Sequence, residues 1–83
     1  MNKSKQALEY YEKALPLYKE LRHPEGIADQ YTNIAYIHVT EGRLETALEL
    51  YKNALPIYQE IECVDKEKYT RQNIERLEAQ LSG

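Results

Sequence analysis

The same fifteen-residue phrase occurs twice in this protein, and this internal repeat limits its fold more than any other feature. Residues 7–21 read ALEYYEKALPLYKEL and residues 47–61 read ALELYKNALPIYQEI, with nine of fifteen positions identical at a constant offset of 40. A fixed period of roughly 20 to 50 residues is typical of stacked repeat proteins. In these proteins each unit buries its apolar face only against the next unit. The sequence therefore favours a binding or scaffolding surface over a catalytic pocket.

Apolar residues recur at helical spacing in four segments, and no segment shows the alternation of a strand. We expect one domain over residues 1–83, with helices at about 3–21, 25–40, 43–62 and 65–81. Pro16 and its repeat Pro56 should bend the first and third helices, or alternatively end them. Gly42 suits the left-handed residue that ends the second helix. Asp65 is expected to be the N-cap of the fourth.

Composition and charge exclude several classes of partner and activity. The 83-residue protein has a formal net charge of −3, so no basic field attracts nucleic acid or an anionic membrane, and we expect neither partner. The single Cys63 cannot form an internal disulfide, and no apolar run reaches signal or transmembrane length, which favours a cytoplasmic setting. His23, His38 and Cys63 form no catalytic or metal-binding motif, so we expect no enzyme activity, metal or cofactor.

The second and third helices carry the spacing of a known repeat. The residues concerned are Tyr31, Ile34, Ala35, His38, Gly42, Ala47, Tyr51, Ala54 and Leu55. In this spacing the sequence resembles the tetratricopeptide repeat (TPR) family, in which small residues let two helices approach and aromatic residues fill the space around them. The period of 40 rather than about 34 residues is similar to a longer variant found in kinesin light chain-like and bacterial signalling members.

This resemblance implies an all-α fold, a fragment of a right-handed α-solenoid built from antiparallel helix-turn-helix units. In the family's notation the four helices follow the order B-A-B-A, so the first helix lacks the A helix that would precede it. Arg71 and Glu75 stand where the second helix has Tyr31 and Ala35. The fourth helix is therefore expected to be a polar capping helix.

The resemblance further implies a non-enzymatic scaffold that binds a peptide or protein segment in a concave groove lined by the A helices. The expected groove residues are Asp29, Thr32, Asn33, Tyr36 and Thr40 on the second helix and Tyr69, Gln72, Asn73 and Arg76 on the fourth. The alternative is that these residues form a solvated face. An Asn amide can donate to and accept from a peptide backbone at once. The carboxylate clamp of chaperone-binding members is not expected, because only Asn33 matches it, and Asp29 would favour a positively charged segment.

The alternative function is a structural or assembly role through the first helix. Without a preceding A helix, one flank of this helix is expected to lie uncovered and to support self-association through Leu8, Tyr11, Leu15 and Tyr18. Each large apolar side chain left in water forgoes roughly 1.5 to 3 kcal/mol. A two-fold homodimer is the simplest result, and exchange of helices through the Gly42 turn is an alternative route. The competing interpretation is that the second helix covers this flank adequately.

Overall fold

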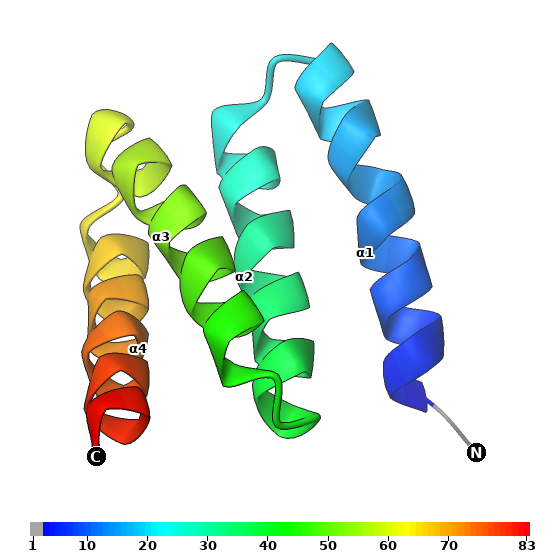
Figure 1. Ribbon diagram of the computed structural model, residues 1–83. Helices are drawn as coiled ribbons and strands as arrows, with labels where there is room; N and C mark the ends of the chain where they lie inside the picture. Colours follow the sequence, from blue (N-terminus) through cyan, green and yellow to red (C-terminus); the bar gives the residue numbers. More distant parts are fainter. Residues whose placement is uncertain (1–2) are drawn as a thin grey trace.

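The computed structural model describes residues 3–83, which form four α-helices and no strand. The helices are α1 (Lys3–Glu20), α2 (Pro24–Thr40), α3 (Leu44–Glu60) and α4 (Val64–Ser82). Each helix runs antiparallel to the one before it, and its main contacts are with its neighbours in sequence (Figure 1). The predicted all-α helical stack is thus confirmed. Pro16 and Pro56 lie inside α1 and α3, so neither helix ends at its proline.

The three turns between helices share one design, repeated every 20 residues. The second residue of each turn has a left-handed backbone, with φ of 52° at Arg22, 81° at Gly42 and 59° at Glu62. The N–H groups of His23, Arg43 and Cys63 then donate to the carbonyls five residues earlier, at Tyr18, His38 and Tyr58. This is the hydrogen-bond pattern of a Schellman C-cap. Of the three positions, only residue 42 is a glycine, the residue type that favours this backbone conformation, as predicted.

Replacing Glu62 by glycine is expected to stabilise the fold by about 0.5–1 kcal/mol, because glycine adopts a positive φ without steric cost. The matched change Gly42→Ala should cost about 1 kcal/mol. Its added Cβ would meet no atom within 4 Å, so only the backbone conformation is tested there. Urea denaturation followed by circular dichroism measures both changes. A Glu62→Gly variant that is not stabilised, or a Gly42→Ala variant that is not destabilised, would contradict this account of the turns.

The prediction that Asp65 caps α4 is wrong. The N-cap is Cys63, whose carbonyl accepts from the Glu67 N–H, and Asp65 lies in the first turn of the helix. The cause is the turn itself, because its last residue is also the N-cap of the next helix. The same arrangement makes His23 the N-cap of α2, with its Nδ1 accepting from the Gly26 N–H at 2.9 Å.

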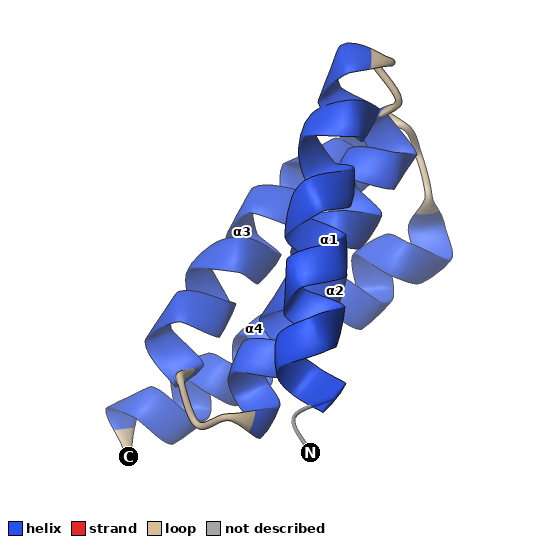
Figure 2. Cartoon of the chain, turned by 90° about the vertical axis from the view of Figure 1, so that its right-hand side faces the viewer, coloured by secondary structure: helices blue, strands red, loops and turns tan. Residues whose placement is uncertain are grey.

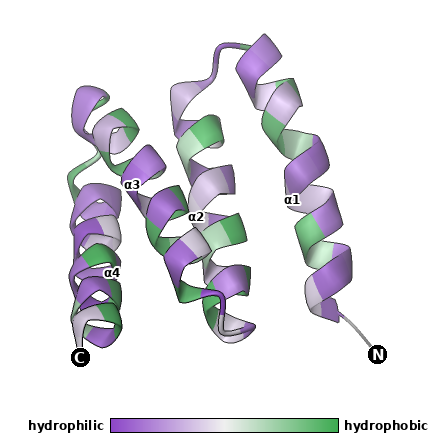
Figure 3. Cartoon of the chain, viewed as in Figure 1, coloured by the Kyte–Doolittle hydropathy of each residue, from purple (hydrophilic) through white to green (hydrophobic). Residues whose placement is uncertain are grey.

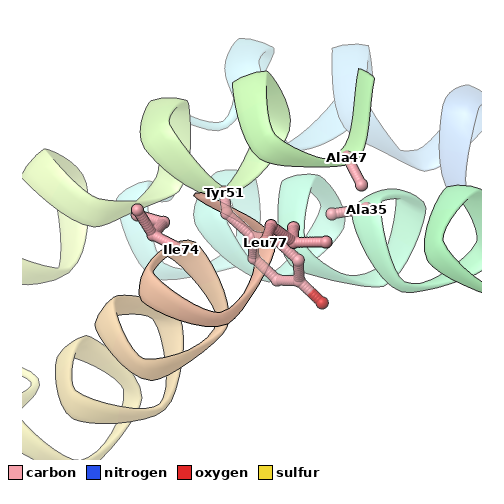
Figure 4. Packing of buried hydrophobic residues seen from close by; sticks show 5 residues of the cluster. All are labelled: Ala35, Ala47, Tyr51, Ile74 and Leu77. Carbon is pink, nitrogen blue, oxygen red and sulfur yellow. The ribbon is translucent and has the colours of Figure 1, made fainter. Parts of the chain in front are cut away.

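The core lies between α2, α3 and α4. One cluster consists of Ala35, Ala47, Tyr51, Ile74 and Leu77 (Figure 4), and a second of Ala28, Ala54 and Tyr58. All four alanines are fully buried, which lets the helix backbones approach closely. In Figure 3, α4 is mostly hydrophilic, and its role as a capping helix stays a prediction.

The two copies of the repeated phrase are packed to very different extents. Tyr51 and Tyr58 on α3 are buried, whereas their counterparts Tyr11 and Tyr18 on α1 are only partly buried. None of the described residues of α1 is fully buried. The difference arises because α3 lies between α2 and α4, while α1 packs mainly on α2 and stands at the edge of the stack (Figures 1 and 2).

Candidate functional site

A groove of about 890 Å³ follows one face of α2, between the first half of α1 and the start of α4. It is lined by Lys3, Ser4, Ala7, Tyr11, Asp29, Thr32, Asn33, Tyr36, Ile37, Thr40, Tyr58, Lys66 and Tyr69. All five residues predicted on the second helix line this groove, together with Tyr69 of the four predicted on the fourth. The structure therefore brings the predicted α2 residues together along one groove, and their role in binding stays a prediction.

Among the α2 residues that line the groove, Thr32 and Thr40 use their hydroxyls within the helix, whereas Asn33 and Tyr36 make no side-chain hydrogen bond within residues 3–83. Thr32 is buried, and its hydroxyl donates to the Asp29 carbonyl at 3.0 Å. The Thr40 hydroxyl likewise donates to the carbonyl of Ile37 at 2.7 Å. Within residues 3–83 no hydrogen bond holds the amide of Asn33 or the hydroxyl of Tyr36, and Tyr36 is 59% exposed. These two side chains are the ones free to bind an incoming polypeptide.

An ion-pair cluster occupies the end of the groove where α2, α3 and α4 meet. Asp29 accepts a hydrogen bond from the Tyr58 hydroxyl and pairs with Lys66 at 3.0 Å. Lys66 also pairs with Glu25 at 2.8 Å, and this bond to Glu25 is the main reason that the pKa of Lys66 is raised. The charge of Asp29 is therefore already compensated. The predicted preference for a positively charged partner segment loses its basis.

Sequence comparison between the repeats could not find this cluster. At the offset of 40, Lys66 corresponds to Gly26 and Asp29 corresponds to Tyr69, so the cluster has no copy elsewhere in the protein. The cluster nevertheless fixes α4 against α2 and supports the wall to which Tyr69 belongs.

The other three residues predicted on the fourth helix do not line the groove. Gln72 and Arg76 are exposed, and the Asn73 amide donates to the Tyr69 carbonyl of its own helix at 2.9 Å. On α2 the same positions face α1 on one side and α4 on the other. No helix among the described residues lies beyond α4, so its outer positions have no opposing wall (Figure 1).

Next to the groove, Tyr51 carries a fully buried hydroxyl that has no hydrogen-bond partner among the described residues. Its ring meets the ring of Tyr69 edge to face, with centroids 6.5 Å apart. Burial raises the pKa of Tyr51 well above the usual tyrosine value, and the neighbouring Tyr69 raises it further. Burial also raises the pKa of Tyr58, as does its hydrogen bond to Asp29. The repeat spacing that gave Tyr51 a packing role does not indicate the polar environment of either tyrosine.

The open flank of α1 is not the one predicted. Leu8, Tyr11, Leu15 and Tyr18 are all partly buried, and the Tyr18 ring lies directly against Gly26 of α2. The reason is that α2 packs on this face of α1, as α4 packs on the same face of α3. The exposed apolar side chains are instead Tyr10, Leu17 and Leu21, at 68%, 59% and 73% exposure. With Lys13, Ala14 and Tyr18 they line a shallow hollow of about 350 Å³ on α1 and the turn residue that follows it.

Nowhere in residues 3–83 do three His, Cys, Asp or Glu side chains gather as they would around a metal ion. The Nδ1 of His38 accepts from the Arg43 side chain at 2.7 Å, and burial, followed by Arg43, lowers the pKa of His38. Over the same residues, none of the helices combines the length and apolar character needed to span a bilayer.

Antiparallel helices stacked in sequence order beside a groove define a helical-repeat protein. The sequence profile described as "Tetratricopeptide repeat" matches residues 1–60, and the protein belongs to this family. The solution NMR structure of the designed protein DA05 has the same fold, with a TM-score of 0.89, 17% identity, and coverage of 100% of this chain and 83% of that one. No curated protein matches the sequence. Members of the family are generally non-enzymatic protein-interaction modules.

Proposed function

We propose that this protein is an interaction scaffold that holds a segment of a partner protein in the groove along α2. The observation that carries the proposal is the open groove of about 890 Å³ into which the Asn33 amide and the Tyr36 hydroxyl project without internal partners. Because α2 fixes the backbone at both positions, binding has to order only the side-chain rotamers, at roughly 0.5–1.5 kcal/mol each.

The chemistry of the groove indicates what such a segment offers. An Asn amide can bind a backbone carbonyl and a backbone N–H together, and tyrosine rings such as Tyr11 and Tyr69 provide large, rigid contact surfaces. Because Lys66 compensates Asp29, backbone polar groups and apolar side chains suit the groove better than a cluster of charges. The net charge of −3 supports a protein partner rather than nucleic acid or a membrane.

The double variant Asn33→Ala with Tyr36→Ala is expected to weaken binding of a groove ligand by about tenfold to a hundredfold, since each lost contact is worth about 1 kcal/mol or more. The probes are peptides selected by phage display against the wild-type protein, with affinities measured by fluorescence polarisation. The pair Gln72→Ala with Arg76→Ala, outside the groove, is the matched control. Unchanged affinity in the first pair, or an equal loss in both, would place the binding site elsewhere.

Assembly is a second candidate function, and the exposure of Tyr10, Leu17 and Leu21 on α1 favours it. Contiguous exposed apolar side chains commonly mark an interface between proteins. This role uses the face of the stack at α1 and leaves the α2 groove available. The two candidates are therefore compatible in one molecule and can be tested separately.

A further inference from the structure

The exposed face of α1 carries a heptad pattern. Tyr10, Ala14, Leu17 and Leu21, the last of which directly follows α1, are spaced by four, three and four residues, and Ala7, three residues before Tyr10, continues the series at the edge of the α2 groove. This is the spacing of the a and d positions of a coiled coil, the seam along which two helices pack. Pro16 lies off this stripe and is exposed. Small alanines alternate with larger side chains along the seam, so a second helix can approach closely.

The same face of α3 shows that it packs against a helix where one is available. Ile57 and Ile61, which correspond to Leu17 and Leu21, are partly buried against the cluster to which Ala28 and Tyr31 of α2 belong. On α1 these positions are open. The α4 of another copy is a poor substitute for α2, because α4 has Lys68 and Arg71 where α2 has Ala28 and Tyr31.

We propose that α1 of a second copy covers this face, antiparallel, with Ala14 opposite Leu17 of the second copy and Tyr10 opposite its Leu21. Two-fold symmetry then places each contact twice in the interface. The proposal gives a specific form to the assembly role described above and rests on it. It is independent of ligand binding in the α2 groove.

Charge complementarity selects the second copy and the antiparallel direction. Lys13 and Glu20 each precede an a position, so both are g positions, which flank the seam of a coiled coil. In the proposed register Lys13 of one copy lies beside Glu20 of the other, on both sides of the symmetry axis. Neither side chain has an ion pair within residues 3–83, so both are available. A parallel pair would instead bring Lys13 towards an uncharged e position, that of Tyr18.

Charge reversal tests the register. Lys13→Glu and Glu20→Lys alone should each weaken dimerisation about tenfold, since two attractive pairs become repulsive. The double variant carrying both changes should regain wild-type affinity, because its reversed charges again match. An equimolar mixture of the two single variants should form a heterodimer. Sedimentation equilibrium measures the affinities, and native mass spectrometry identifies the heterodimer.

Two further variants test whether the interface lies on α1 and whether the protein stays folded without it. Leu17→Asp should give a folded monomer, since the side chain is exposed in the isolated molecule and circular dichroism verifies the fold. Glu60→Lys, the equivalent of Glu20 on α3 and also exposed, should leave dimerisation unchanged. A dimer insensitive to the Lys13 and Glu20 reversals would overturn this register and leave assembly by another face. A wild-type protein that stays monomeric at millimolar concentration would overturn both the proposed register and the assembly role.

Discussion

Replacing Tyr51 by alanine is expected to lower the free energy of unfolding by about 3–5 kcal/mol, the range for removing a large buried aromatic side chain. Tyr51 is fully buried and packs with residues from α2, α3 and α4, so its removal leaves a cavity where three helices meet. A small domain is stable by only about 5 kcal/mol or somewhat more. A large fraction of the molecules should therefore be unfolded at 37 °C.

The repeat supplies a matched control in Tyr11→Ala. Tyr11 occupies the same place in the same phrase, but it is partly buried and lines the open groove. We expect this change to cost about 1–2 kcal/mol, because part of the ring already contacts water. Both variants are best measured by urea denaturation in the Leu17→Asp background, where pairing of α1 cannot contribute. Equal losses would mean that α1 is as well packed as α3, against the structure.

Stability is expected to fall steeply above about pH 10. The pKa values of Tyr51 and Tyr58 are raised in the folded state, whereas the unfolded state has ordinary tyrosine pKa values of about 10. Above that pH the unfolded state loses protons that the folded state retains, so it binds fewer protons and becomes favoured. Each tyrosine then lowers the free energy of unfolding by about 1.4 kcal/mol per pH unit until its folded pKa is reached.

Lys66 contributes in the same direction. Its pKa is raised mainly by Glu25, so the stability it supplies is present below its unfolded pKa and is lost as the pH rises through the folded value. Because the side chain is 42% exposed, its contribution is expected to be smaller than that of the tyrosines.

The variant Tyr51→Phe isolates the contribution of one tyrosine to the pH dependence of stability. Its hydroxyl has no hydrogen-bond partner within the described residues, so phenylalanine should cost little at pH 7. Tyr58→Phe is less suitable, because it gives up the bond to Asp29. In urea titrations between pH 8 and 11, the Tyr51→Phe variant should lose stability less steeply above pH 10, by about 1.4 kcal/mol per pH unit. Parallel curves for the two proteins would mean that Tyr51 ionises alike in both states.

Much of the fold follows from the sequence, because helical spacing and the repeat are local properties. They predicted four helices and the left-handed Gly42, and the resemblance to the family added the small core residue Ala35 and the side chains of α2 that line the groove. They did not predict which face of α1 the neighbouring helix α2 covers. The stripe of α1 is broad, and the packing direction of α2 decides that Leu8 and Leu15 are partly covered while Leu17 is exposed.

The features that the sequence did not reveal are those that occur once. The bonds of Lys66 to Glu25 and Asp29 have no counterpart 40 residues away, and side chains that meet between α2 and α4 leave no periodic signal. The turn geometry makes Cys63 the N-cap of α4 although its side chain makes no capping hydrogen bond, so the usual capping residue Asp65 was misleading. The tertiary structure determines the ion pairs of Lys66, and the turn geometry determines the N-cap positions.

A protein whose helices mainly contact their immediate predecessors needs few distant encounters in order to fold, so rapid folding is expected of it. The same local connectivity means that one end can detach while the rest stays closed. In the monomeric Leu17→Asp variant, amide hydrogens of α1 should therefore exchange with solvent through fraying of that helix alone, whereas those of α3 should exchange only when the whole molecule unfolds. Helix α1 is thus the part of the isolated molecule that is expected to unfold first.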